Sequence, residues 1–573
     1  MIITYDIEVL KYDWIAVFKT GDKFKIFHNN AEKLNEYINE LKYNKSILVG
    51  FNNYHYDDPV VAGIISGRDP YKMSKDIVEG GIKSRLKLNL ITLDVMQELP
   101  LGVGLKSSQA NLGMSIVETP IDFNLDRPLT PKELRLLIDY CKNDVKDTEK
   151  LFNIRNDYFE SKFDLVSEFN LPVSNIRCSR AVLSSKILKC KKTTPPHDRL
   201  HITYVDELNF DLIPTEIVEF YKKCEYDYRC GVSYEEIEKR HLETIILGVP
   251  HSYGFGGLHG AVENYKGRGN YLHIDVGSFY PAQIINFGFM SRASSEPSLY
   301  EQVRDTRMKY KKAKDPRQGV YKIVLNSTFG AMKSEYNTLY DPKMANDICI
   351  NGQLILTQLL MELKDKINLI QSNTDGIIIE YKEQDYDEIV ARVNDFGIRF
   401  RLGFDIDKID KIAQPNVNNY AMLWNNGKLE AKGRFKNFDP NPKEPRFISN
   451  TLSIIDRALV NYYIHGKSIE DTVLEAYQSN DFTPFQIIAK MGRTFDGMYY
   501  EYDGEYVETQ KVNRVFATND KRYGGIYKRK GESYNKIADT SENCIIHNED
   551  ITMFDKTKLD LNYYIELIKK KMF

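Results

Sequence analysis

Two groups of acidic residues, far apart along the chain, have the types and spacing that suit metal-dependent chemistry on phosphate esters. In the first group, Asp6 and Glu8 lie two apart on a predicted strand, so their side chains point to one face. Asp57 follows the end of another predicted strand. Tyr140 and Asp144 lie four apart on a predicted helix and share one of its faces.

If that strand and that helix pack together, the carboxylates of the first group converge. Such a group is electrostatically costly unless divalent cations neutralise it. Two cations about 4 Å apart could then activate a water molecule and stabilise the leaving oxygen of a phosphodiester. Each short pattern by itself is common in surface hairpins and helices. All of them in this order favour a hydrolytic metal site.

The second group lies in the middle of the chain. Asp275 closes a predicted strand, and Asp375 lies at the tip of a predicted hairpin. A predicted helix between them carries Lys322 and Asn326 at a spacing of four, and Phe329 continues the same face. Two carboxylates can hold two Mg²⁺ ions at a nucleoside triphosphate and at the 3′ oxygen of a growing strand. The helix would supply a cation for the phosphates and a surface beside the base.

A second basic helix precedes the first, with Arg307 and Lys311 again four apart. The connection between the two helices, residues 314–319, is short. Two adjacent helices with cationic faces are suited to holding phosphates. By charge alone, a solvated helix face is the simpler interpretation, so the hypothesis depends on the neighbouring carboxylates.

Composition narrows the class of protein. The chain has 573 residues, of which 42% are hydrophobic, so we expect a globular protein of two or three domains. The net charge of −3 does not by itself predict a nucleic-acid partner. The seven cysteines form no Cys-x-x-Cys pair, which argues against structural zinc and a disulfide framework. Without a long apolar run or a signal peptide, we expect a cytoplasmic protein with no membrane partner.

The elements that must position these residues follow from periodicity and turn signals. The N-terminal 160 residues predict an α/β domain, in which Thr130 caps a helix with Glu133 in the capping-box position. The predicted strands are 2–9, 14–19, 23–27, 46–51 and 91–95, and the predicted helices are 31–42 and 131–158.

Downstream, the pattern is mixed. We expect a strand at 271–276, a helical region at 296–366, hairpins at 367–381 and 420–435, and a last part that combines helices at 451–465 and 558–570 with further strands. The fold class is therefore a multidomain combination of α/β and α+β.

The first group resembles the three exonuclease motifs of proofreading domains in DNA polymerases, which are Asp-Ile-Glu, an Asn with Asp five residues later, and Tyr-x-x-x-Asp. This resemblance implies a ribonuclease H-like exonuclease domain over residues 1–160. It also implies that the metal ligands are Asp6, Glu8, Asp57 and Asp144, while Tyr140 orients the attacking water.

The second group resembles family B DNA polymerases. Asp-Val-Gly-Ser-Phe-Tyr-Pro, Lys-x-x-x-Asn-Ser-x-Phe-Gly and Asn-Thr-Asp-Gly match motifs A, B and C of that family in order. The resemblance covers residues 1–435. It implies a right-hand polymerase after the exonuclease domain, with a connecting segment at 161–250, a palm at 251–435 with fingers inserted at about 296–345, and a thumb at 436–573.

The resemblance also implies a role for each matching residue. Asp275 and Asp375 would hold the catalytic metals, and Tyr280 would exclude nucleotides with a 2′-hydroxyl. The residues implied to bind the nucleotide are Ser278, Phe279, Tyr280, Arg307, Lys311, Lys322, Asn326 and Phe329. The residues implied to bind DNA are Tyr253, Gly256 and Gly257 in a Tyr-x-Gly-Gly element, and Tyr420, Lys428 and Lys432 in a primer-gripping region.

The chain departs from the family pattern in motif C, where Asn373 replaces the first aspartate and Gly376 replaces the serine. In motif B, Phe329 replaces a tyrosine. The intervals between the motifs are too short for the insertions of protein-primed phage polymerases. The pattern therefore indicates a compact bacteriophage-type enzyme that extends an ordinary nucleic-acid 3′ end.

These resemblances predict a DNA-directed DNA polymerase with 3′–5′ exonuclease proofreading that replicates a phage genome. It would use two Mg²⁺ ions per site, with Mn²⁺ as a substitute, and would act as a monomer on primer-template DNA and dNTPs, with a processivity factor or a helicase as a further partner. Two alternatives stay open: an exonuclease with a polymerase-derived DNA-binding module, and a primase-polymerase.

Overall fold

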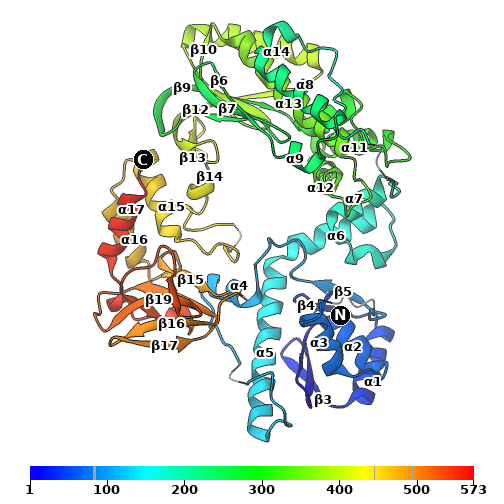
Figure 1. Cartoon of the computed structure of the whole chain (residues 1–573), viewed down its shortest axis with the longest axis vertical. Coiled ribbons are helices and arrows are strands. Elements are labelled where there is room, and N and C mark those ends of the chain that lie inside the picture. Colours follow the sequence, from blue (N-terminus) through cyan, green and yellow to red (C-terminus); the bar gives the residue numbers. More distant parts are fainter. Residues whose placement is uncertain (82–85, 120, 195–196, 444, 493) are drawn as a thin grey trace. The chain divides into compact units, whose positions relative to one another are not determined.

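The computed structural model describes residues 1–81, 86–119, 121–194, 197–443, 445–492 and 494–573 (Figure 1). The chain folds into two compact units, both of which mix helices and strands as expected. Unit 1 consists of Met1–Ser179, Asp439–Ile455 and Glu470–Lys570, and unit 2 consists of Arg180–Phe438, Asp456–Ile469 and Lys571–Phe573. The segment predicted as a single thumb, residues 436–573, therefore contributes to both units.

The N-terminal part of unit 1 is built on a five-stranded sheet. Its order is β3-β2-β1-β4-β5, with β1 antiparallel to β2 and parallel to β4. The strands are β1 (Ile2–Val9), β2 (Trp14–Thr20), β3 (Lys23–His28), β4 (Ile47–Gly50) and β5 (Ile91–Asp94). All five predicted strands are confirmed, with ends that differ by at most one residue.

Alternation along β1 assigns its side chains to two sides. Ile3, Tyr5, Ile7 and Val9 are buried in a core shared with α1 (Ala31–Tyr43) and α2 (Asp57–Ile65), near which α3 (Pro70–Val78) also packs. On the other side, β2 contributes Ile15 and Val17 to a core shared with α5 (Pro131–Ile154). Figure 1 shows α5 apart from α1, α2 and α3. The even-numbered residues of β1 therefore face α5.

The capping box at the start of α5 is confirmed. The Thr130 side chain accepts a hydrogen bond from Glu133 N at 3.3 Å, and the Glu133 carboxylate accepts one from Thr130 N at 2.8 Å. The prediction of one helix up to residue 158 is wrong. Arg155 separates α5 from α6 (Asn156–Glu168), and its guanidinium donates to the carbonyl oxygens of Val95 and Gln97. This tertiary contact has no local sequence signal.

The rest of unit 1 combines α4 (Leu105–Asn111) with the C-terminal strands and helices. A three-stranded sheet has the order β15-β18-β21, and a four-stranded sheet has the order β17-β16-β19-β20. The strands are β15 (Ile487–Lys490), β16 (Gly497–Tyr502), β17 (Glu505–Thr509), β18 (Val512–Ala517), β19 (Tyr523–Lys530), β20 (Ser533–Lys536) and β21 (Cys544–Ile546); the helices are α16 (Ile469–Gln478) and α17 (Leu561–Lys570). The strands predicted for this region are confirmed. α15 (Ser453–Val460), which belongs to unit 2 from Asp456 on, continues as a π-helical turn to His465.

Unit 2 is built around a nine-stranded sheet of the order β14-β13-β12-β9-β11-β10-β8-β7-β6. Its strands are β6 (Leu242–Ile246), β7 (Val249–Tyr253), β8 (His259–Ala261), β9 (Tyr265–Val276), β10 (Ile367–Ser372), β11 (Gly376–Tyr381), β12 (Phe404–Asn416), β13 (Asn419–Trp424) and β14 (Leu429–Lys432). Both predicted hairpins are confirmed, although the second one ends in a 3-10 turn at Gly433–Phe435. β12 was missed, and β9 begins six residues before its predicted start.

Helices complete unit 2, and three of them fill the predicted helical region: α11 (Ser298–Lys312), α12 (Gln318–Met332) and α13 (Pro342–Leu363). The others are α7 (Arg180–Ile187), α8 (Thr215–Arg229), α9 (Tyr234–Ile237), α10 (Phe279–Asn286) and α14 (Tyr386–Phe400). α11 packs against α12, and α12 packs against α7 and α10.

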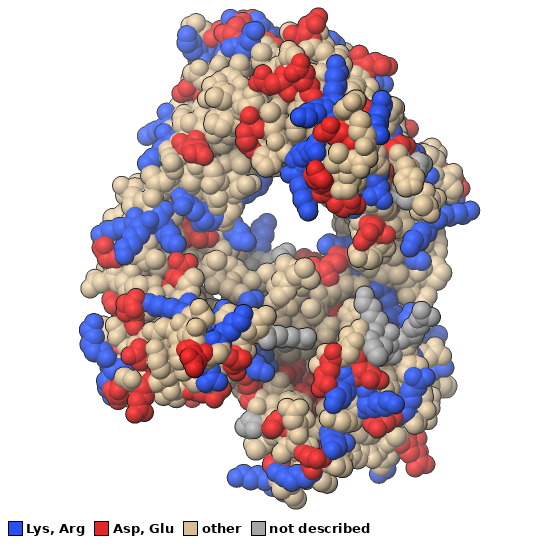
Figure 2. All heavy atoms as spheres, in the orientation of Figure 1, with Lys and Arg blue, Asp and Glu red and all other residues tan. Residues whose placement is uncertain are grey.

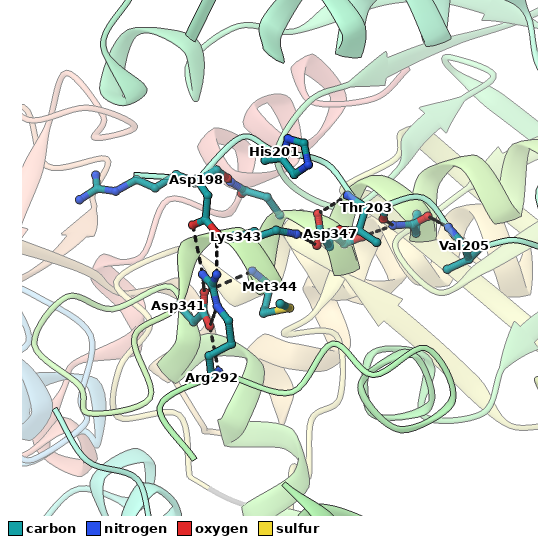
Figure 3. A network of polar contacts seen from close by, with 12 residues as sticks. Asp198, His201, Thr203, Val205, Arg292, Asp341, Lys343, Met344 and Asp347 are labelled. Atoms are coloured by element: carbon teal, nitrogen blue, oxygen red, sulfur yellow. Dashed lines mark hydrogen bonds and ion pairs between the residues drawn. The ribbon is translucent and has the colours of Figure 1, made fainter. Parts of the chain in front are cut away.

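Side chains of α13 form hydrogen bonds with the backbone of the irregular segment around Thr203 in unit 2 (Figure 3). Asp347 Oδ1 accepts from Thr203 N at 3.1 Å, and Lys343 Nζ donates to Asp347 Oδ2 at 2.6 Å. At the start of α13, Arg292 donates to both Asp341 and Asp198, with shortest distances of 2.7 and 2.6 Å. Since the Asp341 side chain is only 3% exposed, it depends on this guanidinium for its neutralisation.

The Arg292→Ala variant is expected to lower the free energy of unfolding of unit 2 by about 1–3 kcal/mol, because Asp341 would stay buried without its partner. The chain has two tryptophans, so a Trp14→Phe background leaves Trp424 of β13 as the fluorescent reporter of unit 2 in urea. The matched control is Arg304→Ala, which removes an i, i+3 pair with Glu301 on α11 and should cost about 0.5 kcal/mol or less. Equal losses for both variants would contradict the assigned role of Arg292.

Candidate active sites

The first predicted group of acidic residues comes together in unit 1. Asp6 and Glu8 lie on the face of β1 that is turned toward α5, and Asp144 lies on α5, whose residues contact β1. One carboxylate oxygen from each of the three residues lies within 4.8 Å of the others. Alternation along the strand and packing of the helix thus bring together residues that are distant in sequence.

Asp57 and Tyr140 lie beside these three carboxylates. Asp57 is the first residue of α2, and its Oδ1 accepts a hydrogen bond from Ile7 N at 3.2 Å. The backbone of β1 between its two acidic residues therefore holds Asp57 in place. Tyr140 lies one helical turn before Asp144 on α5 and is partly buried. All five residues predicted for this site are in one part of unit 1, although Asp57 is not one of the three closest carboxylates.

The crowding of carboxylates changes their acidity. Burial raises the pKa of Asp6 to about 7, and the charge of Asp144 adds to the shift. Burial also raises the pKa of Glu8 and of Asp57 well above the usual range, with the charge of Asp6 as the second cause. Because every ionised carboxylate makes the ionisation of its neighbours harder, the group favours a bound cation.

Lys106 is a further residue of this site that was not predicted from the sequence. Located on α4, it forms an ion pair with Asp144, and its Nζ lies 4.5 Å from the centroid of the Tyr140 ring. Cys141 Sγ, on α5, donates to Asp6 Oδ2 at 3.2 Å. The local sequence offers only an isolated lysine on a short helix, so no periodic pattern could reveal which element it meets.

The donor set fits a hard divalent cation. Converging carboxylate oxygens are the ligands that Mg²⁺ prefers, and their raised pKa values indicate charge that a cation would offset. Within the described part of the chain, this is the one place where three or more His, Cys, Asp or Glu residues bring ligand atoms so close together.

The two carboxylates of the second group lie on neighbouring strands in unit 2. Asp275 is near the end of β9, and Asp375 lies in the tight connection between β10 and β11. Gly376 stands opposite Asp275 in the ladder, and Val276 N donates to Asp375 O at 2.7 Å. Burial raises the pKa of Asp275 to about 7, with the charge of Asp375 as the second cause.

Asp405 is a third carboxylate at this place and was also missed. It lies on β12 directly opposite Asp275, and its charge is a further cause of the raised pKa of Asp275. β9 is thus flanked by β11 on one side and β12 on the other; Asp375 lies in the turn just before β11, and Asp405 lies on β12. Because β12 was not predicted, the register that brings Asp405 here could not be foreseen.

Most of the predicted nucleotide-binding residues lie on α10, α11 and α12; α12 packs against both α10 and α11, and α10 follows β9 along the chain. Ser278 has a left-handed backbone conformation (φ 57°) that turns the chain from β9 into α10, and its hydroxyl accepts from Arg307 Nη1 at 3.4 Å. The rings of Tyr280 and Phe329 lie 4.2 Å apart. Phe279 is buried, whereas the side chains of Lys311, Lys322 and Asn326 are exposed.

The predicted DNA-binding residues differ in accessibility. Tyr253 is fully buried and its hydroxyl forms a hydrogen bond with Thr357, so its ring is not available to a ligand in this conformation. The adjoining Gly256 and Gly257 are at the surface, and a side chain at Gly257 would clash with Thr374, next to Asp375. The glycine loop therefore lies directly against the turn that carries the second carboxylate.

The remaining three predicted residues lie at the opposite edge of the sheet. Tyr420 on β13 is buried and stands opposite Lys432 of β14, whose Nζ lies 5.4 Å from the centroid of its ring. Lys428 is exposed at the tip of this hairpin, 3.7 Å from Glu430. Figure 2 shows basic and acidic side chains interspersed over the visible face, in keeping with the small net charge. Among the described helices, none is long and apolar enough to cross a membrane.

Two of the known proteins to which the chain is similar are DNA polymerases. DNA polymerase 1 of Saccharolobus solfataricus is 20% identical over 197 residues, which make up 31% of this chain and 22% of that relative, so the match spans about a fifth of its length. A solved family B DNA polymerase from the archaeon Pyrobaculum calidifontis aligns with 99% of this chain and 76% of its own, with a TM-score of 0.42 and 13% identity. No protein-family model matches the chain.

The raised pKa of Asp6 makes the stability of unit 1 depend on pH when no metal is bound. The folded protein holds this proton up to about pH 7, whereas the usual pKa is 3.8, so stability falls as the pH rises between these values. Replacing Asp6 by Asn removes that loss. In EDTA, the stability gained through Asp6→Asn should be larger at pH 8 than at pH 5 by about 1–2 kcal/mol.

The measurement is urea unfolding in a Trp424→Phe background, where Trp14 on β2 reports on unit 1. Asp139→Asn, on the exposed side of α5, is the matched control and should change little at either pH. If Asp6→Asn changes the free energy of unfolding by the same amount at both pH values, the raised pKa of Asp6 is contradicted.

Proposed function

We propose that this chain is a template-directed DNA polymerase with 3′–5′ exonuclease proofreading. The observation that carries the proposal is that each group of acidic residues converges within its own unit. Asp6, Glu8 and Asp144 meet between β1 and α5. Asp275 lies near the end of β9, and Asp375 lies beside it in the turn before β11, close enough for its charge to raise the pKa of Asp275. The similarity of 197 residues of the chain to DNA polymerase 1 of Saccharolobus solfataricus supports the same proposal.

The exonuclease reaction would take place in unit 1. Asp6, Glu8, Asp57 and Asp144 are the residues that would hold two Mg²⁺ ions, and the bound ions would supply a water of lowered pKa and stabilise the leaving 3′ oxygen. Tyr140 would orient this water through its hydroxyl. Lys106, already paired with Asp144, would contribute positive charge next to the scissile phosphate.

The polymerase reaction would take place in unit 2. Asp275 and Asp375 would hold the metal ions, with Mn²⁺ as a substitute for Mg²⁺. Arg307, Lys311 and Lys322 would neutralise the triphosphate. Asn326 and Phe329 on α12 would lie next to the nascent base pair, and the packing of Tyr280 against Phe329 would fix the tyrosine ring where a 2′-hydroxyl would project.

The remaining proposals concern organisation and context. Residues 1–160 would be a ribonuclease H-like exonuclease domain, and 251–435 a palm with α11 and α12 as fingers. The segment 436–573 would supply a thumb. Primer-template DNA and dNTPs would be the ligands, and a processivity factor or a helicase a further partner. The setting would be replication of a phage genome in the host cytoplasm by a monomeric enzyme.

A labelled primer on a DNA template with Mg²⁺ tests the two activities separately. Asp275→Ala should lower extension with dNTPs by about 10²-fold or more and leave degradation of the primer intact. Asp6→Ala should do the reverse when nucleotides are omitted. No extension by the wild type would favour a nuclease with a DNA-binding module. Asp275→Ala with normal extension would contradict the metal assignment.

Sugar selection is tested by Tyr280→Val. Removing the ring should increase incorporation of ribonucleotides relative to deoxynucleotides by about 10-fold or more, because the clash at the 2′ position disappears. The ratio of kcat/KM for rNTP and dNTP is the measurement. Phe329→Leu is the control for lost packing against Tyr280. A wild type that already uses ribonucleotides as well as deoxynucleotides would favour a primase-polymerase.

A further inference from the structure

The segment from Gly102 to Glu118, which includes α4, is joined to the C-terminal strands of unit 1 along its whole length. Gln486 Nε2 donates to Asn111 O at 3.1 Å, Ile551 N to Gly113 O at 2.8 Å, and Ile116 N to Asn548 O at 2.7 Å. At its end, the Glu118 carboxylate accepts from the backbone nitrogens of Lys511 and Val512. The segment is thus attached at several points to the C-terminal residues of unit 1.

Arg514 is the centre of this connection. Its side chain, on β18, is completely buried. The guanidinium donates to Ala110 O at 3.1 Å and to Met114 O at 2.7 Å, and so binds the end of α4 and the turn after it. It also donates to Gln486 Oε1 at 2.8 Å and to Glu549 O at 2.6 Å on the C-terminal side.

The opposite end of α4 reaches the acidic site. Lys106 pairs with Asp144, and Gln109 Nε2 donates to Asp147 Oδ2 at 2.5 Å, so two consecutive turns of α5 are contacted by one turn of α4. α4 also contacts β15 and β18, and Figure 1 shows it between the C-terminal strands and α5. A helix of seven residues is too short to be stable without such tertiary contacts.

We propose that the C-terminal strands of unit 1 are a structural part of the nuclease site, and that Arg514 is the positioning residue that fixes α4 and, through it, Lys106 next to Asp144. Chain order alone would place this region in the thumb of the polymerase. Its contacts make it a support for the proposed exonuclease reaction, on which this inference rests.

The physical reason is the number of polar groups that depend on one side chain. Without the Arg514 guanidinium, the Met114 carbonyl loses its hydrogen bond and needs water or another donor, and the buried Ala110 carbonyl, which also accepts from Gly113 N, loses one of its donors. The cheapest rearrangement is a shift of α4 away from β18. Lys106 would move with the helix, whereas Asp6, Glu8 and Asp144 would stay on β1 and α5.

The test compares Arg514→Met with Arg522→Met. Arg522 has the same chemistry and lies in the same C-terminal region, but is exposed and pairs with Asp520 at 2.6 Å. Degradation of a single-stranded oligonucleotide should fall by about 10-fold to 100-fold in Arg514→Met, chiefly in kcat, and stay within about twofold in Arg522→Met. Primer extension, assayed with the exonuclease inactivated by Asp6→Ala, should be unchanged in both.

Two further readouts separate positioning from general destabilisation. In Arg514→Met, amide hydrogen exchange should speed up in residues 105–114 while it stays slow in β1 and α5. In a Lys106→Met background, Arg514→Met should cost little further activity, because its effect passes through Lys106. Unchanged exchange in α4, or fully additive losses in the double variant, would overturn the proposal.

If Arg514→Met does not fold, Glu118→Ala decides by the same measurements, since it removes two hydrogen bonds at the far end of the segment. A wild type without nuclease activity would contradict the proposed function. The exchange experiment would still show whether the C-terminal strands hold α4, so the two failures can be told apart.

Discussion

The arrangement of unit 1 depends on one unfavourable interaction, the repulsion between carboxylates held within a few ångströms of one another. Asp6, Glu8 and Asp144 would move apart if they were free to do so. The pKa of Asp6 is raised first by burial and then by the charge of Asp144. Packing prevents the separation. The odd-numbered side chains of β1 are locked in a core with α1 and α2, and α5 is locked against β2 by a second core. Packing thus keeps these carboxylates close together in spite of their mutual repulsion, which a bound divalent cation would reduce.

In unit 2, packing of the strands also holds carboxylates near one another. Asp275 lies on a strand flanked by two others, and Asp375 and Asp405 reach it from either side. Asn373 occupies the hairpin position where a further carboxylate would have increased the repulsion. Its side chain instead accepts a hydrogen bond from Thr374 N at 2.9 Å, which stabilises the turn itself. The backbone hydrogen bonds of this turn therefore help to hold Asp375 in place.

The C-terminal part of the chain shows why order in sequence and order in space differ. Residues 470–570 follow the central sheet along the chain, yet they pack with the N-terminal unit. The joint consists mainly of hydrogen bonds to backbone carbonyls, many of them from the buried Arg514. Such contacts leave no periodic trace in either segment, because any sequence presents carbonyl groups. The local sequence sign of this joint is Arg514 itself. It is an arginine within a mostly apolar strand, and no sequence pattern pairs it with a carboxylate.

The sequence by itself determined the local elements and the identity of the chemical groups. Alternation predicted β1 with both acidic residues on one face, and the Thr130–Glu133 capping box predicted the start of α5, since both signals involve residues close together in the chain. The tertiary structure alone decided which elements meet. It brought Lys106 to Asp144 and Asp405 to Asp275, buried the Tyr253 ring, and ended α5 at a contact of Arg155 with a distant loop. Those outcomes depend on the register and packing of segments far apart in sequence, which no short-range pattern encodes.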